Sequence, residues 1–165
     1  MFEFRVEQKV FQIGKVSVGG VPGKRPVVLV GSIFYHGHKI FKDEMTGEFD
    51  KKAAEELINL QDELSDKTGN PCMLDVVAAS HEAMMKELDF VASVTKAPIL
   101  IDSPSANVRI AGIKYAESVG LIDRVVYNSI LPEAKASELE EIKQSKMKAQ
   151  FYLPTTPKIS HQEGK

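Results

Sequence analysis

The sequence predicts an α/β protein built around a parallel sheet, and three observations lead to that prediction. Short apolar runs rich in Val, Ile and Leu recur along the chain. Segments with helical spacing of apolar residues alternate with these runs. Three of the runs end near a polar residue, Asp75, Asp102 and Asn128, which are 27 and then 26 residues apart. Alternation of strands and helices favours a parallel sheet with right-handed crossovers.

Composition narrows the classes of function. The 165 residues carry a formal net charge of −2, without the basic excess or stripe typical of nucleic-acid binders, so no nucleic-acid partner is expected. No apolar run reaches the roughly 18 to 20 residues of a membrane-spanning helix, and the charged N-terminus does not resemble a signal peptide. The single Cys72 excludes an internal disulfide and suits the reducing cytoplasm.

The N-terminal segment predicts a β-hairpin over residues 2–18. Its apolar and polar residues alternate, with strands expected at Phe4–Ile13 and Lys15–Val18 around Gly14. A linker rich in Gly and Pro follows. Val27–Gly31 then has no polar alternation and is expected to be a fully buried parallel strand. Lys39–Glu44 reads as a solvated turn.

The remaining apolar runs predict further strands and the segments between them predict helices. The strands are expected at Met73–Val77, Pro98–Ile101, Val125–Tyr127 and Ala149–Leu153, and the helices at Lys51–Lys67, His81–Thr95, Asn107–Val119 and Glu133–Ser145. Gly69 and Gly120 are positioned to end two of the helices. We therefore expect one domain over residues 1–153 and a disordered tail over 154–165.

Two architectures compete for these elements. An open doubly wound sheet usually carries a glycine-rich phosphate loop, and neither GxGxxG nor GxxxxGK[ST] is present. A (β/α)₈ barrel with the hairpin at its bottom needs roughly 210 residues at about 26 per unit. Fewer than 140 residues follow Pro26. The barrel prediction is therefore the N-terminal part of a TIM barrel, with four to five βα units after the hairpin.

The polar trio Asp75, Asp102 and Asn128 is the first candidate site. At the C-terminal ends of neighbouring parallel strands these side chains would share one rim, where α/β proteins bind ligands. Each one alone could instead cap the next helix. A carboxylate can make two parallel hydrogen bonds to an amidine-like edge, and an asparagine can both donate and accept. The trio suits a flat polar heterocycle such as a pterin or guanine.

The loop after the first strand of the repeat is the second candidate. His36 and His38 flank Gly37, but no third metal ligand has obvious spacing, so no metal is predicted. His36 and Ser103 are rim candidates, with His36 as a proton carrier, and plain loop packing is the alternative. Arg109 could reach an anionic ligand, although an ion pair with a neighbouring acid is favoured.

Several long stretches resemble the H-subunit family of tetrahydromethanopterin S-methyltransferase, whose members are methyl-tetrahydropterin:corrinoid methyltransferases of the pterin-binding barrel superfamily. The matching stretches include GSIFYHGHKI (31–40), DELSDKTGNPCMLDVVAAS (62–80) and PILIDSPSANVRIAGIKYAESVGLIDRVVYNSI (98–130). The resemblance is expected to cover residues 2–149 and to stop there. Because family members continue through further strands, the chain looks truncated after about residue 149.

The resemblance implies a TIM barrel that moves a methyl group between N5 of a methylated tetrahydropterin and the cobalt of a corrinoid protein. Tetrahydromethanopterin or tetrahydrofolate is the implied methyl carrier, and the implied pathways are one-carbon metabolism and methanogenesis. Asp102 and Asn128 match pterin-contacting residues, and Asp75 occupies the preceding strand. Asn128 is expected to act catalytically as the nearest hydrogen-bond donor to N5. Pro104 and Leu131 depart from the residues that relatives commonly carry there.

The resemblance also implies partners and a location. A protein-bound cobalamin, other subunits of a methyltransferase complex and a homodimer are expected. The chain itself would be cytoplasmic and peripheral to a membrane complex. One alternative is an inactive fragment that keeps the fold and binds pterin or pairs with a second chain. Another is an open-sheet protein that binds a nucleotide or phosphate ester instead.

Overall fold

A five-stranded parallel sheet organises the chain. The computed structural model describes residues 5–147 and 150–152. Within them the strand order is β3-β6-β7-β8-β9, with parallel pairing throughout. The strands are β3 (Leu29–Ile33), β6 (Cys72–Val77), β7 (Ile99–Asp102), β8 (Val125–Ile130) and β9 (Gln150–Tyr152). Both the α/β class and the parallel sheet are as predicted.

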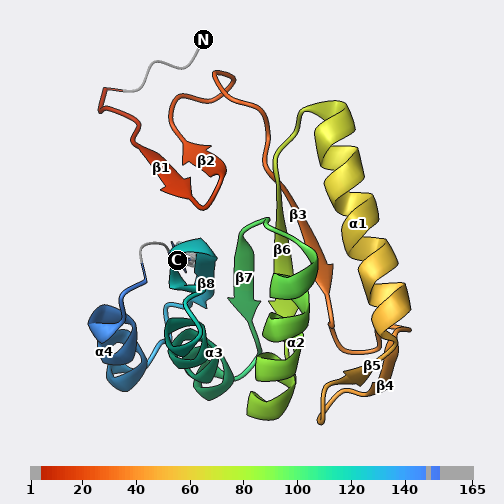
Figure 1. Ribbon diagram of the computed structural model, residues 1–165. Helices are drawn as coiled ribbons and strands as arrows, with labels where there is room; N and C mark the ends of the chain where they lie inside the picture. Colours follow the sequence, from red (N-terminus) through yellow and green to blue (C-terminus); the bar gives the residue numbers. More distant parts are fainter. Residues whose placement is uncertain (1–4, 148–149, 153–165) are drawn as a thin grey trace, which may run out of the picture.

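Four α-helices follow strands of this sheet, and Figure 1 shows them gathered on one of its sides. They are α1 (Lys51–Thr68), α2 (His81–Val94), α3 (Ala106–Ser118) and α4 (Ala136–Gln144). A short 3₁₀ turn, η1 (Ile122–Arg124), leads into β8. Each predicted helix is present, and α4 begins three residues later than expected because residues 131–134 form a turn closed by Ala134 N–H donating to the Leu131 carbonyl.

Side chains at the helix ends explain two of the boundaries. Asp50 caps α1 by accepting a hydrogen bond from the Ala53 N–H, and Ser80 caps α2 in the same way through Ala83. The α1 helix ends at Gly69, whose φ of 71° is the left-handed conformation that glycine adopts at little cost.

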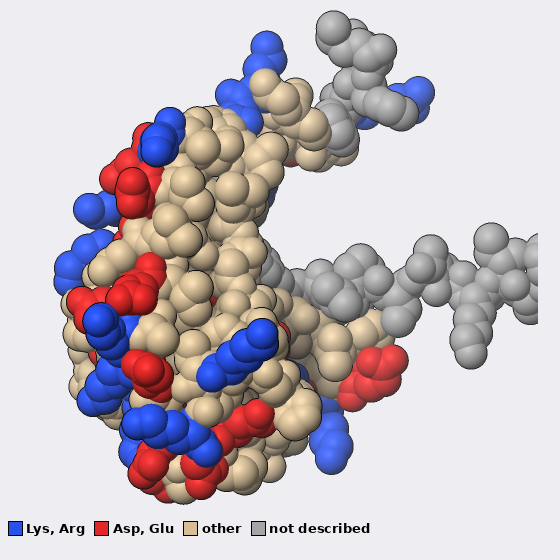
Figure 2. Space-filling model, turned by 90° about the vertical axis from the view of Figure 1, so that its right-hand side faces the viewer, with Lys and Arg blue, Asp and Glu red and all other residues tan. Residues whose placement is uncertain are grey.

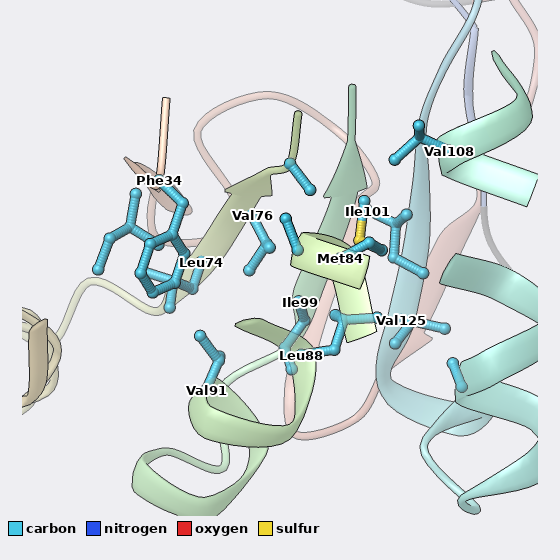
Figure 3. Close-up of a cluster of buried hydrophobic side chains, with 14 of the residues drawn as sticks. Phe34, Leu74, Val76, Met84, Leu88, Val91, Ile99, Ile101, Val108 and Val125 are labelled. Carbon is cyan, nitrogen blue, oxygen red and sulfur yellow. The ribbon is translucent and has the colours of Figure 1, made fainter. Parts of the chain in front are cut away.

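The two faces of the sheet have different partners because successive strand residues point to opposite faces. One face packs against the helices, where Val76, Ile101 and Val125 meet apolar side chains such as Met84 and Leu88 of α2 (Figure 3). The opposite face carries Met73, Leu100 and Val126, which pack against Ile13 and Val16.

Ile13 and Val16 belong to the N-terminal hairpin of β1 (Val10–Ile13) and β2 (Val16–Gly19). Its turn at Gly14 lies close to Pro98 and Arg124, which directly precede β7 and β8. The hairpin therefore covers the N-terminal ends of the strands, the position expected for it in a barrel. The first strand is shorter than the predicted Phe4–Ile13, and the second is shifted by one residue from the predicted Lys15–Val18. Residues 1–4 lie outside the described part of the chain.

The first sheet strand corrects one prediction. Val27–Gly31 was expected to be fully buried, but β3 begins at Leu29 and its side chains Leu29 and Val30 are 51% and 48% exposed. The reason is that β3 lies at the edge of the described sheet and pairs only with β6. Its apolar composition therefore does not reflect burial within the described residues.

A second small hairpin replaces the predicted solvated turn at Lys39–Glu44. It consists of β4 (Phe41–Asp43) and β5 (Glu48–Phe49), paired antiparallel. Phe49 brings it against Phe34 and Phe90, with ring centroids 4.5 Å and 5.0 Å apart. The loop after β3 is therefore anchored to α2 by aromatic packing.

The molecule is hollowed on the side away from the helices (Figure 2). The charged side chains visible in this view cluster on the helical side, and the walls of the hollow are mostly uncharged. A curved parallel sheet with helices outside and a hairpin at one end is consistent with part of an α/β barrel. The predicted tail at 154–165 lies outside the described residues. In the part of the chain that the structure describes, no helix is both long and apolar enough to cross a membrane.

Candidate functional site

The three predicted residues lie on one face of three neighbouring strands. Asp102 ends β7 and pairs in register with Asn128 of β8. Asp75 lies two residues deeper, because Val77, the last residue of β6, is the register partner of Asp102. The predicted strands ended just before Asp102 and Asn128, but Asp102 is the last residue of β7 and β8 continues for two residues beyond Asn128. Asp75 lies within β6, as the predicted strand Met73–Val77 implies. The two-residue period nevertheless places them on the hairpin side of the sheet.

Hydrogen bonds join part of this trio across the sheet. The Asn128 Nδ2 group donates to Asp75 Oδ1 at 3.1 Å, although β7 lies between their strands. The other carboxylate oxygen of Asp75 accepts a hydrogen bond from the Ser32 hydroxyl of β3 at 2.8 Å. Asp75 itself is only 6% exposed. The structure thus brings residues of β3, β6 and β8 together on the concave face.

Asp102 lies beside this network and has an altered protonation equilibrium. Burial raises the pKa of the Asp102 carboxyl above its ordinary value, and the negative charge of Asp75 raises it further. The Ser103 N–H, which donates to Asp102 Oδ1 at 2.7 Å, and the positive charge of Arg109 act in the opposite direction. A partly buried carboxyl next to a second carboxylate favours a ligand that brings hydrogen-bond donors to it.

The alternative in which these polar residues merely cap helices does not fit the structure. The N-cap positions of α2, α3 and α4 belong to Ser80, Ser105 and Lys135. The trio therefore has no helix-capping role.

The two rim candidates occupy different environments. The His36 side chain is 96% exposed, and its Nδ1 lies 2.7 Å from Glu44 Oε2. This contact and the Gly37 N–H, the larger cause, lower the pKa of Glu44. Ser103 is only 2% exposed, and its hydroxyl accepts from the Ser105 N–H. His36 thus pairs with Glu44 at the surface, whereas Ser103 is buried.

Arg109 forms the favoured ion pair, and its partner is Glu138 of α4. Arg109 Nη2 lies 2.9 Å from Glu138 Oε1, and both side chains are nearly buried. Arg109 Nη1 also donates to the Ser103 carbonyl, and the guanidinium carbon lies 5.1 Å from the ring centroid of Tyr127. The Tyr127 hydroxyl donates to Glu138, and burial together with that carboxylate raises the pKa of Tyr127 to about 12. This network lies on the face of the sheet that the helices cover, and it holds in place both the loop after Asp102 and the strand that carries Asn128.

Sequence reasoning missed Ser32 and Glu138. Ser32 follows the apolar run of β3, the same position relative to its run that drew attention to the trio, so its signal was present in the sequence. Glu138 lies in a mixed charge segment that is typical of a solvated helix face. Nothing in that segment indicates a buried partner for Arg109.

No metal centre is evident among the described residues, where no group of three or more His, Cys, Asp or Glu side chains could hold an ion. His38 instead lies against the Tyr35 ring, with centroids 4.5 Å apart. Burial lowers the pKa of His38.

Comparisons with known proteins place this arrangement in a family. The family model described as tetrahydromethanopterin S-methyltransferase MtrH subunit matches residues 6–165. Relatives named as the H subunit of tetrahydromethanopterin S-methyltransferase share 50% identity over 96% of this chain in Methanopyrus kandleri, and 48% over all of it in Methanothermobacter marburgensis. The similarity continues beyond residue 149, so the expectation that it stops there is wrong. The chain spans 49% and 53% of the lengths of these relatives.

Proposed function

The chain belongs to the MtrH family of tetrahydromethanopterin S-methyltransferase subunits, and from this membership we propose that its concave face carries part of a methyl-tetrahydropterin site. The reaction would move a methyl group between N5 of methylated tetrahydromethanopterin and the cobalt of a corrinoid protein, with tetrahydrofolate as the alternative carrier. The observation that carries the proposal is the polar cluster of Ser32, Asp75, Asp102 and Asn128 on the concave face. Sequence resemblance selects two of these same residues for pterin contact.

The donor and acceptor set suits the heterocycle. A pterin ring presents adjacent N–H groups, and a carboxylate such as Asp102 can accept two parallel hydrogen bonds from such an edge. Burial and Asp75 disfavour the charged form of Asp102 in the free protein. A ligand that donates hydrogen bonds to this carboxylate would stabilise the charged form and lower the pKa of Asp102 again. In this proposal Asp75, Asp102 and Asn128 bind the ring, and His36 and Ser103 lie at the edge of the site.

The chemistry divides between the chain and its partner. The corrinoid, held on a separate protein, supplies the nucleophile that accepts the methyl group. Residues of this chain orient the pterin, with Asp102 holding the ring and Asn128 near N5, whose protonation makes the amine a better leaving group. These roles are consistent with an open concave face, since a large partner must approach the methyl group.

We extend the proposal to the assembly. The curved sheet, the hairpin at the N-terminal strand ends and the half-length match support the first half of a (β/α)₈ barrel. The proposed partners are a corrinoid protein, further subunits of a methyltransferase complex and a second copy of this chain, with peripheral attachment to a membrane complex. The alternative proposal, an inactive unit that pairs with a second chain, is favoured by the exposed apolar edge at β3.

Calorimetric titration with methyl-tetrahydromethanopterin and methyl-tetrahydrofolate tests the site. We expect saturable binding by the unaltered chain, and binding about tenfold or more weaker in Asp102→Ala and Asn128→Ala, because each removes hydrogen bonds to the ring. Asp66→Ala, at an exposed position of α1, is the matched control and should bind normally. Equal affinity in the unaltered chain and both site variants would overturn the assignment of these residues.

A further inference from the structure

Asp75 uses both oxygens of its carboxylate to hold neighbouring side chains. Oδ2 accepts from the Ser32 hydroxyl at 2.8 Å, and Oδ1 accepts from Asn128 Nδ2 at 3.1 Å. The Asp75 side chain is almost fully buried, so its position is well defined by its surroundings. Neither Ser32 nor Asp75 belongs to a helix cap, and both lie inside strands.

This geometry decides which way the Asn128 amide faces. A carboxylate has acceptor oxygens and no donor, so the NH₂ end of the amide must face Asp75. The flipped amide would set its carbonyl oxygen against a carboxylate oxygen. The Asn128 Oδ1 atom therefore lies on the side away from Asp75, and among the described residues it has no hydrogen-bond partner.

We propose that Ser32 and Asp75 are positioning residues that lock the Asn128 amide, so that its carbonyl oxygen accepts a hydrogen bond from an N–H of the ligand. This inference rests on the proposed pterin site. It changes the expected role of Asn128 from donor to acceptor, and that of Asp75 from a ring contact to a positioning residue. Its ligand class is a heterocycle with an N–H donor opposite Asn128.

A protonated N5 of a methylated tetrahydropterin meets this requirement. In the proposed transfer, the N5–CH₃ bond would break with its electron pair remaining on N5, and the methyl group would pass to the cobalt nucleophile supplied by the corrinoid protein. The proton already on N5 stays there as the N–H of the demethylated product. The Asn128 oxygen can accept from this same N–H before and after transfer, so it stabilises the protonated form from which the methyl group leaves.

A reciprocal exchange of the two side chains tests the acceptor role. In Asn128→Asp two carboxylates face each other, and we expect methyl-tetrahydromethanopterin to bind at least about tenfold more weakly. In Asp75→Asn the amide at position 128 loses its fixed orientation, and affinity should also fall. The double variant D75N/N128D restores a pair in which position 75 accepts from Ser32 and donates to position 128.

The double variant distinguishes a residue 128 that accepts a hydrogen bond from the ligand from one that donates a hydrogen bond to it. The carboxylate introduced at position 128 can accept from a ligand N–H but cannot donate. We expect affinity within about threefold of the unaltered chain. If the double variant regained thermal stability but not affinity for methyl-tetrahydromethanopterin, the acceptor role would be overturned. The pair of residues 75 and 128 would then serve only the stability of the fold. Failure of the unaltered chain to bind any methyl-tetrahydropterin would instead count against the proposed function.

The orientation of the amide is tested without ligand. In ¹⁵N-labelled chain, the Nδ2 protons of Asn128, assigned by their loss in Asn128→Ala, should shift in Asp75→Asn and shift less in Ser32→Ala. The same protons should exchange faster with solvent in both variants. Unchanged resonances in Asp75→Asn would overturn the positioning role whatever the result of the titrations.

Discussion

At the scale of single residues, Glu87 of α2 is the most unusual ionisable group outside the site. Its side chain is fully buried, and within the described part of the chain neither of its carboxyl oxygens has a hydrogen-bond partner. Burial raises the pKa of Glu87 to about 9. The folded protein therefore holds a neutral carboxylic acid at neutral pH, since an isolated buried charge is costly.

Replacement of Glu87 should change the pH dependence of stability. A raised pKa in the folded state means that stability is fully present below the unfolded value of 4.5 and falls as pH rises towards about 9, where the folded protein loses the proton. The expected slope approaches about 1.4 kcal/mol per pH unit in this range. Glu87→Gln should flatten it, so that the variant is more stable than the unaltered chain at pH 8.

Chemical denaturation at pH 5 and pH 8 checks this prediction. Glu55→Gln, at an exposed position of α1, is the matched control and should leave the slope unchanged. An equal pH slope in the unaltered chain and Glu87→Gln would contradict the neutral buried acid.

At the scale of elements, the contact of α3 with α2 and β7 depends on the absence of a side chain at Gly112. A Cβ atom there would lie 2.8 Å from Ile101 Cγ2 and 3.0 Å from Met84 Cγ. Helix propensity alone predicts that Gly112→Ala adds about 1 kcal/mol of stability. The close contacts involve a stiff β-branched side chain and a buried methionine, and overpacking of this kind costs about 1–3 kcal/mol.

We therefore expect Gly112→Ala to destabilise the protein by up to about 2 kcal/mol, with steric strain outweighing the gain in propensity. Thermal or urea unfolding measures the difference. Ser118→Ala, at the exposed last residue of the same helix, is the comparison, in which the gain in propensity is opposed only by the loss of an exposed hydrogen bond to the Tyr115 carbonyl. A gain in stability for Gly112→Ala would contradict the tight packing of α3.

The elements also show what the sequence could and could not predict. The helices and inner strands were predicted because apolar periodicity and end signals such as Gly69 act locally. The edge position of β3 could not be predicted, because a continuous apolar run has the same composition whether one or two strands flank it.

In the candidate site, the positions of Asp102 and Asn128 followed from strand spacing. The link from Ser32 to Asp75 depends on the register of β3 against β6, in which the two residues are partners. The buried Arg109–Glu138 pair depends on how α3 and α4 pack.

At the scale of the whole molecule, the β3 side presents an apolar surface. Leu29 and Val30 of β3 and the exposed leucines of α1 line a groove of about 430 Å³, with Leu57, Leu60 and Leu64 spaced along the helix. An unpaired apolar edge strand readily accepts another strand. Relatives of about twice this length have further chain that could cover such an edge.

We expect the chain to associate with itself as its concentration rises, and Val30→Lys to reduce that association, because a charge on an edge strand opposes pairing. Sedimentation velocity over a range of concentrations measures it. Leu139→Lys, which changes an equally exposed leucine on α4, is the control and should have little effect. A monomer at every concentration, or an equal effect of both variants, would contradict the role of this edge.

The most direct test of the proposed pterin site on the concave face is to locate the bound ligand. We would titrate ¹⁵N-labelled chain with methyl-tetrahydromethanopterin and map the amide resonances that move. We expect shifts concentrated at the concave-face residues Ser32, Asp75, Asp102 and Asn128. Saturable binding with shifts confined instead to the pocket of about 550 Å³ between α3 and α4, around Asn107 and Lys114, would contradict it.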